Sequence, residues 1–89
     1  MSLAPVSVGQ KIRHIRETMG LSRPKFAELL GVPQTTLKNY ELGYREVGGA
    51  FLVALAHQEQ LHKFTLWLLS DKIAPEIGQI SPAEYVIQK

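Results

Sequence analysis

Apolar residues recur at helical spacing near the start of the chain. They stand four, three and four positions apart and are Val8, Ile12, Ile15 and Met19. This spacing places them on one face of a helix. Ser7 and Gln10 are spaced as a capping box, and Gly20 follows the last apolar position, so an amphipathic helix is predicted up to Gly20. Its opposite face is expected to point to water and carries Lys11, Arg13, His14 and Glu17.

A second, shorter helix is predicted between Ser22 and Gly31. Its apolar residues are Phe26, Ala27, Leu29 and Leu30. Ser22 is a suitable N-cap, and Pro24 lies in the first turn, where a missing N–H costs little. Gly31 supplies the left-handed residue that ends the helix, and Val32 is then expected to enter the core.

A third helix is predicted to open at Pro33 and to close at Gly43. Its inward residues are Leu37 and Tyr40. Its outward residues are Gln34, Thr35, Lys38 and Asn39. Two short helices joined by a glycine turn can cross steeply only where the residues at the crossing are small, which explains Ala27. A polar first turn held outward by an apolar anchor is what a DNA-reading helix-turn-helix requires, and residues 23–42 meet this requirement.

The rest of the chain predicts two further helices and an irregular tail. The fourth helix follows Gly48 and Gly49 and is expected to reach the region of residues 58–60. The fifth extends from about His62 to Ser70 and is apolar nearly all round. Beyond Asp71 no helical period is present, and residues 85–87 favour a short strand. The predicted fold is therefore all-α and compact, with five helices in a domain at residues 1–72 and a short irregular tail at 73–89.

Composition narrows the functional classes. The chain has 89 residues, 45% of them hydrophobic, which is enough for one core. The absence of cysteine excludes disulfides and thiolate metal sites. No segment has the pattern of a membrane span or a signal peptide. The expected location is therefore cytoplasmic. Residues 10–45 hold seven basic and three acidic residues, a balance of +4, and the remainder has a balance of −2. This asymmetry fits one face turned toward phosphates, although an ordinary mixture of surface charges would also produce it.

The segment at residues 9–43, GQKIRHIRETMGLSRPKFAELLGVPQTTLKNYELG, resembles the lambda-repressor-like, or Cro/XRE, helix-turn-helix family. The likeness rests on GLS before the second helix, FAELLGV within it, QTTLKNYE in the third, a closing ELG, and TLWLLS in the fifth. It extends from about Val8 to Ser70. The resemblance implies a five-helix domain that is usually dimeric on DNA and that places its third helix in the major groove.

The resemblance assigns base contacts to the third helix. Gln34 occupies the position that typically touches a base, and Thr35 and Asn39 share its face. Glutamine and asparagine pair bidentately with adenine, and a threonine methyl can touch that of thymine, so an A·T-containing half-site is the hypothesis. Lys38 is a further candidate, for a guanine edge or a phosphate. The alternative is that these are simply solvated polar residues.

Phosphate contacts are expected around the second helix and the loop after the third. The candidates are Ser22, Arg23, Lys25, Thr36 and Arg45. Arg23 stands where the family commonly has glutamine, and an unengaged surface charge is the alternative for each lysine. The resemblance further implies a buried structural ion pair between Arg16 and Glu41.

Three departures from the family pattern bear on geometry. Pro33 replaces the usual serine or threonine cap of the third helix, which weakens exact base assignments. Gly48 and Gly49 start the fourth helix less firmly than usual, and the link at residues 57–61 lacks the customary glycine. These last two departures leave the dimer geometry open.

Partner surfaces are expected in the C-terminal part of the chain. The fifth helix is more apolar than one side of a small core requires, so a homodimer contact is predicted for Leu66, Trp67 and Leu69. A wholly intramolecular core is the alternative. The tail at 73–89 is a candidate arm for a dimer or another protein partner, and a loose tail is equally compatible with it.

Catalytic and metal chemistry have no support in the sequence. His57, Glu59 and His62 do not place both imidazoles on one helical face, and no nucleophile, phosphate loop or carboxylate pair resembles an active site. No enzyme activity and no cofactor are expected. The function indicated is a sequence-specific regulator binding a double-stranded DNA operator, a repressor of phage or bacterial type. The alternatives are an antitoxin that also binds a toxin, and a protein-interaction module that has lost DNA binding.

Overall fold

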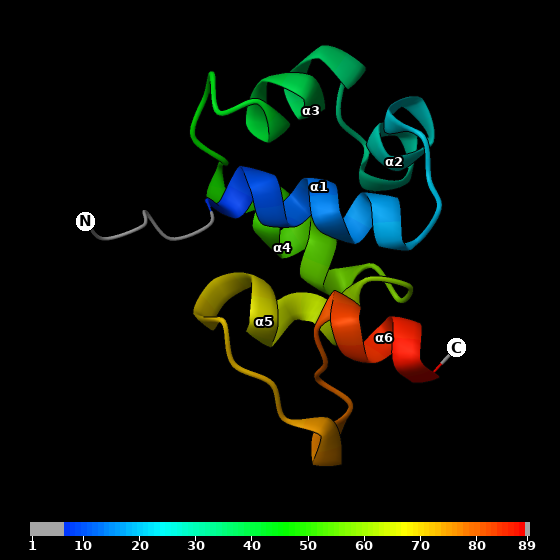
Figure 1. Ribbon diagram of the computed structural model, residues 1–89. Coiled ribbons are helices and arrows are strands. Elements are labelled where there is room, and N and C mark those ends of the chain that lie inside the picture. Colours follow the sequence, from blue (N-terminus) through cyan, green and yellow to red (C-terminus); the bar gives the residue numbers. More distant parts are fainter. Residues whose placement is uncertain (1–6, 89) are drawn as a thin grey trace, which may run out of the picture.

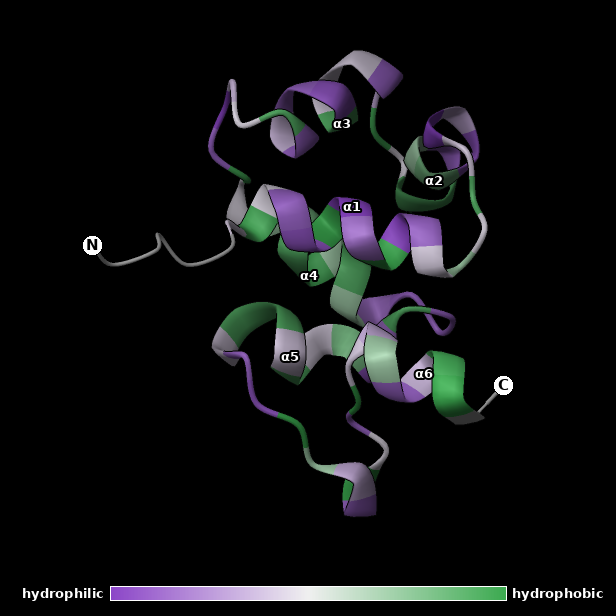
Figure 2. Cartoon of the chain, viewed as in Figure 1, coloured by the Kyte–Doolittle hydropathy of each residue, from purple (hydrophilic) through white to green (hydrophobic). Residues whose placement is uncertain are grey.

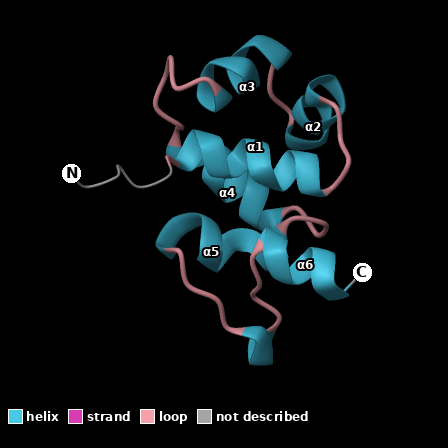
Figure 3. Ribbon diagram, in the orientation of Figure 1, coloured by secondary structure: helices cyan, strands magenta, loops and turns pink. Residues whose placement is uncertain are grey.

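The computed structural model describes residues 7–88, which contain six α-helices and no strand (Figures 1 and 3). The helices are α1 (Val8–Thr18), α2 (Arg23–Leu30), α3 (Gln34–Glu41), α4 (Gly49–His57), α5 (Thr65–Ser70) and α6 (Pro82–Gln88). Two 3₁₀ turns, η1 (His62–Phe64) and η2 (Pro75–Ile77), lie between them. The predicted all-α fold is confirmed.

Helix α1 lies at the middle of the molecule, with α2 and α3 on one side of it and α5 and α6 on the other (Figure 1). The core holds side chains from every α-helix up to α5, and those with no exposed surface include Ile12, Ile15, Phe26, Leu37, Leu55 and Phe64. The predicted apolar stripes therefore meet in one core. The predicted capping box of α1 forms, and Gly31 ends α2 with a φ of 69°.

Helix α4 is shorter than predicted. It ends at His57, because the next residue, Gln58, adopts an extended backbone with a ψ of 119°. The Nε2 of Gln58 donates a hydrogen bond of 3.1 Å to the carbonyl of Leu29. The chain thus leaves α4 at the residue whose side-chain amide, that of Gln58, binds the end of α2.

The tail differs from the prediction, since residues 85–87 lie in helix α6 and not in a strand. The hydroxyl of Ser81 accepts a hydrogen bond from the backbone N–H of Glu84 at 3.5 Å and donates one to the side-chain carboxylate of Glu84. Pro82 occupies the first helical position, where its fixed φ suits a helix. Tyr85 packs edge-on against Phe64, with ring centroids 5.9 Å apart. Local capping and this aromatic contact stabilise α6, which is too short for a helical repeat of apolar residues to be recognised in the sequence.

Lys11 does not point to water as predicted, because its side chain is buried between α1 and α5. Its Nζ donates to the carbonyls of Trp67 and Leu68 at 3.1 and 3.4 Å and pairs with Asp71. These carbonyls lie in the last turn of α5, where a helix lacks its full set of internal partners; that of Trp67 also accepts from the backbone N–H of Asp71 at 2.9 Å. Lys11 therefore caps α5 from the neighbouring helix, whereas Arg13, His14 and Glu17 are exposed as predicted.

Gly9 brings α1 and α3 close together. A Cβ built on Gly9 would lie 1.9 Å from the carbonyl oxygen of Tyr40, which is far inside van der Waals contact. Because the obstacle is backbone, it cannot rotate away. This glycine is therefore required by the approach of the two helices.

We expect Gly9→Ala to lower the free energy of unfolding by about 1–3 kcal/mol, the usual cost of an overpacked site, despite alanine's better helix propensity. Gly49→Ala is the matched control, since a Cβ at Gly49 in α4 meets nothing within 4 Å. That change should be neutral or stabilise by up to about 1 kcal/mol. Urea denaturation measures both, and equal stabilities for the two variants would contradict the close approach of α1 and α3.

Candidate nucleic-acid interface

Helix α3 is anchored on one side and exposed on the other. Leu37 is fully buried, and Tyr40, 7% exposed, packs edge-on against Phe51 of α4 at 5.1 Å between ring centroids. Three of the predicted base-contact residues, Gln34, Thr35 and Lys38, are exposed. Asn39 and the predicted phosphate contact Thr36 are half-buried. The anchor therefore fixes which side of α3 faces outward.

Within residues 7–88, no other helix lies over the outer side of α3, and the ribbon of α3 is largely hydrophilic in colour (Figure 2). Helices α5 and α6 lie beyond α1, at the far side of the molecule (Figure 2). Pro33 precedes α3 as its N-cap and supplies no side-chain hydrogen bond, as expected from the missing serine or threonine. The first turn of α3 thus keeps its backbone N–H groups without a side-chain cap.

The start of α2 presents a second polar group of side chains. Ser22 accepts a hydrogen bond from the backbone N–H of Lys25 at 3.3 Å, which confirms it as the N-cap. Ser22 and Lys25 are both exposed, and Arg45, in the loop after α3, is exposed with its guanidinium 5.9 Å from the ring of Tyr40. These three predicted phosphate contacts are therefore open to solvent.

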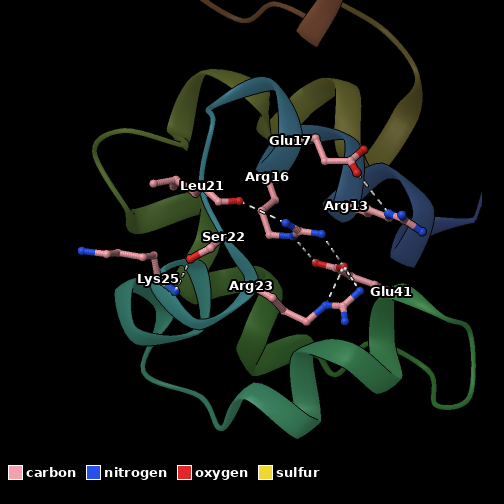
Figure 4. Close-up of polar contacts among 8 residues, drawn as sticks. All are labelled: Arg13, Arg16, Glu17, Leu21, Ser22, Arg23, Lys25 and Glu41. Atoms are coloured by element: carbon pink, nitrogen blue, oxygen red, sulfur yellow. Dashed lines mark hydrogen bonds and ion pairs between the residues drawn. The ribbon is translucent and has the colours of Figure 1, made fainter.

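The predicted ion pair between Arg16 and Glu41 is present and buried. The Nε of Arg16 donates to Oε2 of Glu41 at 2.7 Å and its Nη2 to Oε1 at 3.0 Å (Figure 4). The remaining Nη1 donates to the carbonyl of Leu21 at 3.0 Å. The hydrogen bond to Glu41, together with the negative charge, raises the pKa of Arg16 above its usual value although burial opposes this. The ion pair therefore favours the charged form of Arg16.

Arg23 joins the same carboxylate, a contact that the sequence analysis missed. Its Nε and Nη2 donate to Oε1 of Glu41 at 3.2 and 3.1 Å (Figure 4). The side chain of Glu41 has no exposed surface, whereas those of Arg16 and Arg23 are 11% and 25% exposed. We call these three residues the Glu41 cluster. The one hint of this contact in the sequence was the arginine at the first position of α2, where the family commonly has glutamine.

The predicted dimer residues lie in different surroundings. Leu66 and Trp67 are half-buried, and Trp67 contacts His14 of α1 at 6.0 Å between ring centroids. Leu69 is 59% exposed. Much of the apolar surface of Trp67 is thus used within the chain, and Leu69 is the one of the three that is open.

The histidines considered as metal ligands bind backbone carbonyls. The Nδ1 of His57 lies 2.9 Å from the carbonyl oxygen of Val53, and that of His62 lies 2.9 Å from that of Ala56. Within residues 7–88 no three histidine, cysteine, aspartate or glutamate side chains are grouped as metal ligands. No helix in this part of the chain is long and apolar enough to cross a membrane.

A short helix, a glycine turn and an outward-facing second helix define the helix-turn-helix class. Comparison with known proteins agrees, since a family described as "Helix-turn-helix" matches residues 12–58. The chain is also similar to Repressor protein C of Escherichia phage P2, with 39% identity over 77 residues that cover 86% of this chain and 78% of that protein. The chain belongs to the helix-turn-helix family, of the lambda-repressor-like (Cro/XRE) type.

We expect Glu41→Gln to lower the free energy of unfolding by about 3–5 kcal/mol, because it leaves two guanidinium groups without their carboxylate. The control is Glu17→Gln, which breaks an exposed pair with Arg13 and should cost less than about 1 kcal/mol. Chemical denaturation monitored by circular dichroism compares them. Similar losses for both variants would show that burial of the Glu41 cluster contributes little.

Proposed function

We propose that this chain is a sequence-specific regulator that binds double-stranded DNA and represses transcription, with α3 in the major groove. The observation that carries the proposal is the exposed polar side of α3, anchored from behind by Leu37 and Tyr40. A major groove about 12 Å wide admits one α-helix. Similarity to a phage repressor protein supports the same function.

Base reading is assigned to the outer side of α3. Gln34 and Asn39 offer amides that pair bidentately with adenine, Thr35 offers a methyl group for thymine, and Lys38 reaches toward guanine. The operator half-site is therefore proposed to contain A·T pairs. Selection of bound sites from a random duplex library identifies the operator, and a domain that selects no sequence would refute this function.

Phosphate contacts are assigned to both flanks of α3. The proposed residues are Ser22, Arg23, Lys25, Thr36 and Arg45. Such contacts fix the register of a protein on the duplex without reading sequence, and they make binding fall with salt as counterions are released. The charge balance of +4 in residues 10–45 is consistent with this role.

We expect Gln34→Ala to reduce discrimination between the selected duplex and a scrambled one by about 1–3 kcal/mol, the worth of one bidentate base contact. Lys25→Gln should weaken binding to both duplexes alike and reduce the magnitude of the salt slope by about 0.9. Fluorescence anisotropy at several salt concentrations measures both effects. If the two variants lost affinity in the same pattern, the division into base and phosphate contacts would be wrong.

We further propose that the chain acts as a homodimer whose contact lies at the end remote from α3. Leu69 is open there, and so are apolar side chains of the tail, Ile73, Ile77, Val86 and Ile87. A contact at this end keeps both reading helices free for half-sites about 34 Å apart, one turn of DNA.

We expect Leu69→Glu to raise the dimer dissociation constant at least about tenfold, because a charge would be buried in the contact. Val53→Glu is the matched control, since Val53 in α4 is 57% exposed, close to the 59% of Leu69. Sedimentation equilibrium compares the two. A wild-type chain that stays monomeric on its operator, or equal shifts from both variants, would contradict this contact.

A further inference from the structure

The guanidinium of Arg23 is committed to the protein before any DNA arrives. Two of its nitrogens, Nε and Nη2, donate to Glu41 at 3.2 and 3.1 Å, and only Nη1 lies outside these bonds. The pairing with a fully buried carboxylate gives this side chain a structural role in addition to any phosphate contact.

The contact connects the two helices of the reading motif at defined points. Arg23 is the first residue of α2, and Glu41 is the last residue of α3. Arg16 of α1 holds the same carboxylate from the other side, so its Oε1 accepts from both arginines. Arg16 binds both oxygens of the carboxylate as a planar fork, which restricts its direction, and Arg23 brings two N–H groups to the single oxygen Oε1, which ties that oxygen to the start of α2.

Besides its close approach to Gly9 of α1, helix α3 is held mainly by apolar packing. It contains eight residues, and its N-cap, Pro33, makes no side-chain hydrogen bond. Leu37 and Tyr40 anchor one face by apolar packing, which is not directional. The directional restraint at the end of α3 is supplied by the Glu41 cluster.

We propose that Arg23 is a positioning residue for α3: by holding Glu41 it sets the angle at which Gln34 and its neighbours meet the bases, and so governs sequence discrimination. This inference rests on the proposed DNA-binding function. Nη1 remains available to a phosphate, so Arg23 links a backbone contact to the orientation of the reading helix. The Glu41 cluster has two cations and one carboxylate, and a phosphate would balance the extra charge.

Arg23→Lys separates positioning from phosphate binding. Lysine keeps the positive charge, but its ammonium group cannot donate two bonds from a rigid fork. We expect the affinity for a scrambled duplex to stay within about twofold of wild type and the salt slope to change by less than about 0.3, well below the change of about 0.9 that one lost phosphate contact would cause. The ratio of affinities for the selected and scrambled duplexes should fall about tenfold, the worth of one misplaced base contact.

Lys25→Gln is the matched control for a phosphate contact alone. Lys25 lies two residues further along α2, is exposed, and makes no side-chain bond to Glu41. Loss of Lys25 should weaken binding to both duplexes equally and leave the ratio of the two affinities unchanged. An unchanged ratio in Arg23→Lys would overturn the positioning role.

Hydrogen exchange of the full-length chain without DNA gives a second readout. Arg23→Lys should speed exchange of the amides of α3 relative to those of α1, whereas Lys25→Gln should leave both as in wild type. Equal exchange of α3 in the two variants would count against the proposal. A wild-type chain that prefers no duplex would refute the proposed function instead, and the exchange measurement would still test the contact.

Discussion

A carboxylate buried among α1, α2 and α3 is the interaction on which the helix-turn-helix part of this protein depends. Glu41 has no exposed side-chain surface, and its oxygens receive hydrogen bonds from Arg16 of α1 and Arg23 of α2. Removing a charge from water is costly unless the geometry of its partners is good. The three helices must therefore meet in one arrangement for the carboxylate to be tolerated, whereas apolar contacts alone would permit some sliding. The Glu41 cluster thus specifies the arrangement as well as stabilising it.

Helix α1 connects the part that holds α2 and α3 to the part that holds α5 and α6 through two cationic side chains. Arg16 binds Glu41 and the carbonyl of Leu21 on the side of α2 and α3. Lys11 binds the carbonyls of Trp67 and Leu68 at the end of α5 on the other side. Both place a positive charge against acceptors of the neighbouring elements, a carboxylate and a loop carbonyl for Arg16 and C-terminal helix carbonyls for Lys11. The polar residues of α1 therefore join the two halves, in addition to its apolar stripe.

The sequence predicted the elements whose signals are local and missed those that depend on distant contacts. The caps at Ser7 and Ser22 and the left-handed Gly31 could be recognised because each acts within four residues. Helix α6 could not, since seven residues give too little period and its packing on Phe64 joins distant parts of the chain. For the same reason Lys11 was predicted to point to water and Arg23 only to contact a phosphate. Their partners lie 56 and 18 positions away, and only the folded chain brings them together.

The geometry of α3 explains why a buried pair at one end matters to the polar residues at the other. Eight residues span about 12 Å, so a tilt of about 10° about the Glu41 end would move the first turn by about 2 Å. Hydrogen bonds tolerate only about 0.5 Å in donor–acceptor distance. Pro33 supplies no side-chain cap, so no side-chain hydrogen bond from the N-cap opposes such a tilt at the first turn. The position of Gln34, the proposed base contact, therefore depends on side chains at the other end of α3.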